Sequence, residues 1–261
     1  MARLRAPDGC PWDREQTLQS LRPYLIEEAY ELLEAMDGGD PDQHCEELGD
    51  LLLQIVFQSQ LAAERGDFDA RDVVAGLCRK LVRRHPHVFG EESAASAADV
   101  VVHWERIKRQ EKHRDDGSPP AGALDGVPAS LPGLLAAQKL SQRAARVGFD
   151  WDGPQAVREK LHEEIGELEQ ALDAAPDAER QAALAWEIGD LLFAATNLAR
   201  HLDLDAEDAL RQANQRFRRR FALVERLAAE RGIDLRQAGI DALEALWQEA
   251  KARLAAAAEQ P

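Results

Sequence analysis

Two acidic motifs occur in the same order in both halves of this chain. In the first half, Glu28 and Glu31 are followed by Glu47 and Asp50, and the members of each pair are three positions apart. The second half repeats the pattern with Glu164, Glu167, Glu187 and Asp190. Residues three positions apart share a face of an α-helix, so two packed helices would bring four carboxylates together. The pattern predicts two repeats of a helical unit, each with an acidic centre.

The aspartates of both motifs lie in apolar sequence. Asp50 occurs in ELGDLLLQIVF and Asp190 in EIGDLLFAATNLA, which predicts helices that are buried in a core. An ionised carboxylate there is costly unless a positive group meets it. A solvated acidic helix face is the alternative, but recurrence in both repeats favours a divalent cation. Because neither motif aligns a His or Cys with the acids, oxygen ligation favours Mg²⁺, with Mn²⁺ as substitute.

Helix start signals occur throughout the chain, whereas the alternating pattern of strands is nearly absent. Asp40 followed by Pro41 predicts an N-cap and first helical residue, and Asp69 and Asp205 are predicted N-caps of two further helices. Apolar residues recur at helical spacing between these signals. The predicted fold class is therefore all-α.

A segment rich in Gly, Pro and Asp separates the two repeats. Residues 113–129 read HRDDGSPPAGALDGVPA, a composition typical of a linker. This predicts an N-terminal domain over 1–112 and a C-terminal domain over 130–261. Other landmarks recur in register, namely Trp12 with Trp151 and Trp104/Lys108 with Trp247/Lys251. The chain is thus a duplicated domain rather than a short-period array.

The two repeats differ at their starts. The second is predicted to begin with a helix over about 132–147, before its Gly148-Phe149-Asp150-Trp151 segment. The first repeat has only nine residues before Cys10. Its opening helix is therefore truncated, or the true start lies upstream of Met1.

Charge and composition exclude several classes of partner. The net charge of −16 argues against stable binding of nucleic acid or an anionic membrane surface. Three cysteines without a C-x-x-C pair suit a reducing compartment. The start has no signal-peptide segment, and no run approaches the roughly 20 apolar residues of a membrane span. We expect a cytoplasmic protein.

Basic residues cluster late in this acidic chain. Arg216 and Arg220 lie in RQANQRFRRRF at helical i,i+4 spacing, where two guanidinium groups and a nearby metal would form a polyphosphate clamp. Lys251 would add a charge, and Trp247 would stack on a base. The alternatives are a basic face that balances acidic neighbours and a tryptophan used for packing. Because no glycine-rich phosphate loop is present, phosphates must be held by metal and side chains.

Together these residues resemble the MazG family of nucleoside triphosphate pyrophosphohydrolases, in its tandem-domain form. The resemblance rests on GCPWD, EEAYE, EELGDLLLQIVFQSQ, KLVRRHPHVF and HWERIK in the first half, and on VGFDW, EEIGE, EIGDLLFAATNLARHL and ANQRFRRRF in the second. It implies Mg²⁺-dependent cleavage of a nucleoside triphosphate to monophosphate and pyrophosphate. It also implies a homodimer in which helices of two subunits complete each four-helix-bundle-like core, with the C-terminal repeat as the main catalytic one.

The resemblance assigns roles to particular residues. The metal ligands and catalytic acids would be Glu164, Glu167, Glu187 and Asp190, with a second metal site at Glu28, Glu31, Glu47 and Asp50. Nucleotide contacts would come from Lys160, Arg216, Arg220, Trp247 and Lys251. Two alternatives stay open: a narrower all-α pyrophosphohydrolase for dUTP or phosphoribosyl-ATP, and a nucleotide-sensing, partner-binding dimer without turnover.

Overall fold

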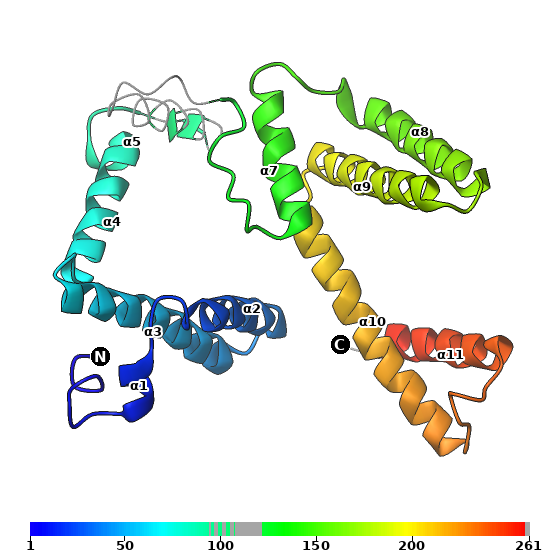
Figure 1. The fold of residues 1–261 in the computed structure, drawn as a ribbon, viewed down its shortest axis with the longest axis horizontal. Helices are drawn as coiled ribbons and strands as arrows, with labels where there is room; N and C mark the ends of the chain where they lie inside the picture. Colours follow the sequence, from blue (N-terminus) through cyan, green and yellow to red (C-terminus); the bar gives the residue numbers. More distant parts are fainter. Residues whose placement is uncertain (94, 97–98, 101–102, 105–106, 108–121, 259–261) are drawn as a thin grey trace. The chain divides into compact units, whose positions relative to one another are not determined.

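The computed structural model describes residues 1–93, 95–96, 99–100, 103–104, 107 and 122–258 (Figure 1). Every regular element within this part of the chain is a helix, which confirms the all-α prediction. The chain divides into two compact units, an N-terminal unit Met1–Gly117 and a C-terminal unit Ser118–Pro261. The division lies inside the segment predicted as a linker, of which residues 113–121 are outside the described part.

The N-terminal unit is built around an antiparallel helix pair. Its helices are α1 (Pro11–Glu15), α2 (Arg22–Gly38), α3 (Pro41–Arg65), α4 (Ala70–Arg84) and α5 (Pro86–Phe89). Helices α2 and α3 pack side by side, joined by a tight turn in which Gly39 adopts a φ of 71°. Glycine suits this left-handed conformation because it has no Cβ. As predicted, Asp40 caps α3, and its carboxylate accepts a hydrogen bond from Asp42 N at 3.0 Å.

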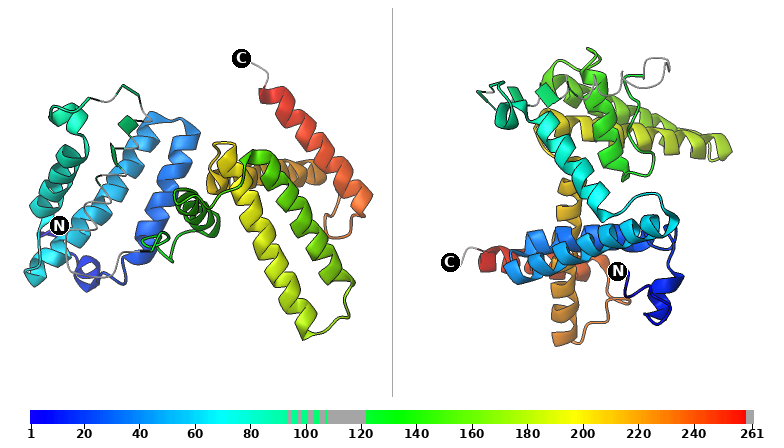
Figure 2. Two further views of the ribbon diagram at one scale, coloured as in Figure 1. Left: turned by 90° about the horizontal axis from the view of Figure 1, so that it is seen from above. Right: turned by 90° about the vertical axis from the view of Figure 1, so that its left-hand side faces the viewer.

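The C-terminal unit repeats the helix pair and adds a long extension. Its helices are α7 (Gly133–Ala145), α8 (Gly153–Asp173), α9 (Ala178–His201), α10 (Ala206–Glu230) and α11 (Ile240–Ala258). Helices α8 and α9 form an antiparallel hairpin, and α7 packs on α9 (Figure 2). The predicted opening helix is observed as α7, whereas residues before Cys10 in the N-terminal unit form turns. Asp69 and Asp205 cap α4 and α10 as predicted.

A buried glutamine fixes the corner between α9 and α10. Gln138 of α7 is 7% exposed; its Nε2 donates to Leu204 O at 2.9 Å, and its Oε1 accepts from Ala206 N at 2.8 Å. Glu207 accepts a further bond from Leu135 N at 3.2 Å. Because a buried amide that loses its partners is costly, these bonds hold the first turn of α10 to α7.

Helices α10 and α11 share a core of their own. It contains Leu223, Val224, Leu227, Ala228, Leu246 and Ala250. Figure 1 shows α10 leading from the corner away from the α8–α9 hairpin, with α11 packed along its far half. None of the helices described is long and apolar enough to cross a membrane.

Candidate metal and phosphate site

The acidic centre of the C-terminal unit lies between the two helices of the α8–α9 hairpin. Glu164 and Glu167 on α8 and Glu187 on α9 each offer a carboxylate oxygen, and these oxygens lie within 4.8 Å of one another. Glu164 is only 4% exposed. The i,i+3 spacing read from the sequence therefore places both α8 acids opposite Glu187.

Asp190 is placed differently from the sequence expectation. It lies outside the trio and is exposed, although its apolar neighbours predicted a core position. The same helix exposes Trp186 to 73% and Leu192 to 51%. The physical reason is that α8 and α7 cover only part of the surface of α9, so the rest of its apolar surface has no cover within the described part of one chain.

Mutual repulsion and a lysine set the electrostatics of this centre. The pKa of Glu187 is raised, first by desolvation and then by the charges of Glu167, Asp190 and Glu164. Lys160 Nζ lies 2.7 Å from carboxylate oxygens of both Glu163 and Glu164, and these contacts raise the pKa of the lysine. In the absence of metal, the ammonium group therefore partly neutralises the centre from one side.

The N-terminal unit has an equivalent trio. Glu28 on α2 joins Glu47 and Asp50 on α3, with one oxygen of each within 4.8 Å of the others; Glu31 lies outside this trio. All three are half-buried, and burial is the largest cause of the raised pKa of both Glu28 and Glu47. Position 24, the counterpart of the lysine in the other unit, holds Tyr24, so no ammonium group comes from there.

Both trios fit a hard divalent cation. The donors are carboxylate oxygens from two helices, and the buried Oε2 of Glu47 has no hydrogen-bond partner among the described residues. Ionised carboxylates held this close repel one another, and a divalent cation between them would offset the repulsion. The residues that would hold the ion are Glu164, Glu167 and Glu187 in one unit and Glu28, Glu47 and Asp50 in the other.

The predicted phosphate-binding arginines lie on a different part of the C-terminal unit. Arg216 is exposed on α10, and the Arg220 guanidinium carbon lies 5.9 Å from the ring centroid of Trp247 on α11. The same ring lies 5.3 Å from that of Phe217 and borders the α10–α11 core, so Trp247 packs as well as contacts a cation. Lys251 is exposed.

Helix α11 makes no contact with α8 or α9 in the described residues. Helix α10, which carries both arginines, makes no contact with α8 in the described residues either, so this part of the chain does not show the arginines beside the acidic trio. The assignment of these residues to nucleotide binding stays a prediction.

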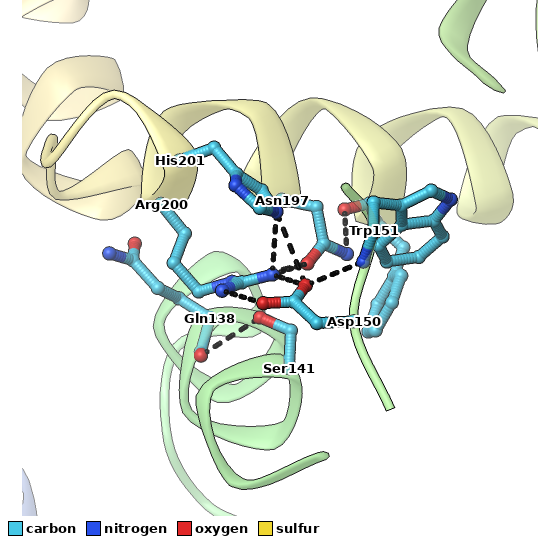
Figure 3. A network of polar contacts seen from close by, with 8 residues as sticks. Gln138, Ser141, Asp150, Trp151, Asn197, Arg200 and His201 are labelled. Carbon is cyan, nitrogen blue, oxygen red and sulfur yellow. Dashed lines mark hydrogen bonds and ion pairs between the residues drawn. The ribbon is translucent and has the colours of Figure 1, made fainter. Parts of the chain in front are cut away.

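Sequence reasoning missed a polar network at the end of α9, drawn in Figure 3. The Asp150 carboxylate accepts hydrogen bonds from both terminal nitrogens of Arg200, one at 3.0 Å, and lies 3.2 Å from His201 Nε2. The guanidinium group lowers the pKa of Asp150. Asn197, fully buried, accepts from Arg200 at 3.2 Å. The sequence feature that could have indicated this network is the segment Gly-Phe-Asp-Trp-Asp at residues 148–152. The equivalent segment of the first repeat has Pro11 at the position of Asp150.

Beside this network lies a cavity of about 330 Å³. Its walls include the rings of Phe149, Trp151 and Phe193, together with Leu140 and Ala144. Flat aromatic walls next to a charged network suit a planar group. Phe193 lies about 9 Å along α9 from Glu187, at a rise of about 1.5 Å per residue. The acidic trio and the cavity therefore lie along the same helix, with the cavity toward its C-terminal end.

Comparison with known proteins decides the family. The sequence model of the MazG nucleotide pyrophosphohydrolase domain matches twice, over residues 16–89 and 152–224. The chain belongs to the MazG family. Both matches contain an acidic trio, and the second contains Arg216 and Arg220 but ends before Trp247.

Two relatives align with nearly the whole of this chain. The Escherichia coli K12 protein named nucleoside triphosphate pyrophosphohydrolase is 47% identical, over 96% of this chain and 94% of its own. A Thermotoga maritima protein named nucleoside triphosphate pyrophosphohydrolase/pyrophosphatase MazG is 45% identical, over 96% of this chain and 92% of its own. The tandem arrangement of two MazG domains is thereby confirmed.

The raised pKa of Glu187 predicts how pH changes metal binding by this MazG protein. A carboxyl whose folded pKa is raised favours folding below its unfolded pKa, and that contribution is lost as pH rises through the folded value. Metal-free protein should therefore lose stability as pH rises above the ordinary glutamate range, and Mg²⁺ should restore it. We expect the Mg²⁺-induced rise in melting temperature to be larger at about pH 8 than at about pH 5. Glu187→Gln should reduce that difference; an equal rise at both pH values would contradict the prediction.

Proposed function

We propose that this protein is an Mg²⁺-dependent enzyme that hydrolyses nucleoside triphosphates to nucleoside monophosphates and pyrophosphate. The observation that carries the proposal is the trio Glu164, Glu167 and Glu187, whose oxygens converge from two helices. The names of the Escherichia coli and Thermotoga maritima relatives support the reaction class. Mn²⁺ is the expected substitute because its ligand preference is similar.

A bound divalent cation would neutralise phosphate charge and make a water molecule easier to deprotonate. Side chains of the C-terminal unit would bind the ion and contact the phosphates. Glu164, Glu167 and Glu187, with Asp190 beside them, would hold the ion. Lys160 Nζ lies 2.7 Å from Glu164. Its ammonium group would therefore be near a phosphate oxygen that binds to an ion held by this carboxylate.

The position of the cavity beside Asp150 supports one orientation of the bound nucleotide. We place the base between the rings of Phe149, Trp151 and Phe193, and the phosphates toward Glu187. The first repeat has Cys10 and Leu53 where the second has Phe149 and Phe193, so its walls would be less aromatic. This difference, together with the missing lysine, supports the C-terminal unit as the main catalytic one.

Removal of the metal tests the proposal directly. We expect pyrophosphate release from a panel of ribo- and deoxynucleoside triphosphates to need Mg²⁺ or Mn²⁺ and to stop on exhaustive chelation, because every candidate ligand is a carboxylate. Ca²⁺, which is larger and looser in geometry, should bind but support little turnover. Full activity after chelation would contradict the metal role.

The same panel separates the alternatives. Activity confined to dUTP or phosphoribosyl-ATP would identify the narrower enzyme. Tight nucleotide binding without pyrophosphate release at any metal concentration would identify the sensing dimer.

A further inference from the structure

The segment that connects α7 to α8, residues 146–152, is held to the end of α9 by an ion pair. The Asp150 carboxylate accepts hydrogen bonds from both terminal nitrogens of Arg200, and the arginine side chain is only 13% exposed. The same carboxylate accepts a bond from Trp151 N at 2.9 Å. Figure 3 shows Asp150 lying between Arg200 and Trp151. Because a guanidinium fork and a carboxylate fix each other's orientation, this pair holds the backbone of the connecting segment in place.

A buried amide extends this link to the opposite wall of the cavity. Asn197, which is fully buried, accepts a bond from Arg200 at 3.2 Å and donates one to Phe193 O, also at 3.2 Å. Phe193 is one aromatic wall of the cavity, and Phe149 and Trp151 of the connecting segment are the others. A continuous series of hydrogen bonds therefore joins the two sides of the cavity.

Two glycines give the backbone on either side of these rings an unusual conformation. Gly148 has a φ of 86° and Gly153 a φ of 81°, in the left-handed region that glycine enters without a Cβ penalty. The Phe149 ring between them is 75% exposed, so packing restrains it little. The positions of the two rings therefore depend on the bonds that Asp150 makes.

The N-terminal unit holds its corresponding segment with an ion pair of opposite polarity. Here the arginine, Arg5, precedes the hairpin and donates to both oxygens of Glu64 near the end of α3, each at 2.8 Å. Arg5 also donates to Asp13 O, and its guanidinium carbon lies 5.6 Å from the ring centroid of Phe57. Phe57 occupies the position that Asn197 has in the other unit. The two repeats therefore tie the segment before the hairpin to the C-terminal end of its second helix, but with different residues.

We propose that Asp150 and Arg200 are positioning residues for the base of the nucleotide. Through the connecting segment, they hold the aromatic walls of the cavity in the orientation in which the rings can stack on a planar base. Arg200 lies about 20 Å along α9 from Glu187 of the acidic trio, at about 1.5 Å per residue. The pair therefore acts on binding of the base and not on the metal or the chemical step. The proposal rests on the proposed function for its substrate.

Steady-state kinetics with a base-free inhibitor test this role. Asp150→Asn combined with Arg200→Met replaces the pair by neutral side chains, so that no buried charge is left without a partner. KM for a nucleoside triphosphate should rise at least about tenfold while kcat changes less than about threefold, because the lost interaction is made equally in the ground state and the transition state. Inorganic tripolyphosphate, which has the phosphates but no base, should inhibit the original protein and the variant with the same inhibition constant.

Glu64→Gln is the matched control, because it removes the equivalent ion pair from the N-terminal unit and should leave both KM and kcat unchanged. Asp150→Glu keeps a carboxylate for the guanidinium group and should keep most of the affinity. If the double variant does not fold, Arg200→Lys, which keeps the charge but not the fork, gives the same comparison. A folded variant with unchanged KM, or one that loses affinity equally for tripolyphosphate, would overturn the proposal, because a merely structural pair would disturb the whole site.

Direct binding keeps the proposal testable if no triphosphate is hydrolysed. Calorimetry with Mg²⁺ measures the affinity of the full chain for a nucleoside triphosphate whose α–β bridging oxygen is replaced by a methylene group, so that pyrophosphate cannot be released. Binding at least about tenfold weaker in the double variant would support the positioning role, and the missing hydrolysis would then contradict the proposed function alone. Equal affinities, or no binding by the original protein, would overturn the positioning role.

Discussion

Glu164→Gln is expected to lower pyrophosphate release at least about 100-fold, because a metal ligand worth several kcal/mol in the transition state is replaced by a neutral amide. Glu28→Gln should leave most of the activity. The physical reason for the asymmetry is that Lys160 lies 2.7 Å from the buried Glu164 of the C-terminal centre, whereas the corresponding position of the N-terminal unit holds Tyr24. Initial rates with saturating Mg²⁺ measure both effects.

A neutral substitution on the same helix provides the control for this comparison. Glu169 is exposed on α8 outside the trio, so Glu169→Gln removes the same charge without touching the centre and should keep full activity. The reverse pattern, with Glu28→Gln inactive and Glu164→Gln active, would make the N-terminal unit the enzyme. Equal losses would mean that the two centres are coupled.

The helices and the acidic centres could be predicted because their signals are local. Asp40, Asp69 and Asp205 cap helices through backbone groups two or three residues away, so the sequence order alone specifies them. The meeting of Glu164 with Glu187 needed one further assumption, that two consecutive amphipathic helices pair. A short connection between α8 and α9 makes that pairing the simplest outcome.

The positions of Asp190 and Arg220 could not be predicted because they depend on what covers a helix. An apolar run such as EIGDLLFAATNLA is compatible with burial in one chain or in an assembly, and periodicity does not distinguish the two. The direction of α10 depends on Gln138, a polar residue that sequence patterns place on the surface. Likewise, the pairing of Asp150 with Arg200 joins residues far apart in sequence, and no local signal specifies their contact.

Asp190→Asn is expected to abolish turnover while leaving the metal-free protein at least as stable as the original. Asp190 is exposed and raises the pKa of Glu187 by repulsion, so its neutral replacement removes an unfavourable interaction and nearly keeps the side-chain volume. Mg²⁺ at about 100 times its dissociation constant stabilises the original protein by about 2.7 kcal/mol, because it binds only the folded state. The variant, which has lost one ligand, should gain much less from the same concentration.

Thermal melts of both proteins, with and without Mg²⁺, separate this role from a structural one. If Asp190 served a structural hydrogen bond or ion pair, its replacement would destabilise the metal-free protein by about 1–3 kcal/mol. A variant destabilised in this way that still releases pyrophosphate would remove Asp190 from the metal centre. A variant with an unchanged metal-free melting temperature, a reduced Mg²⁺ response and no turnover would place Asp190 at the metal even though it lies outside the trio, because binding of the ion would then draw in the fourth carboxylate.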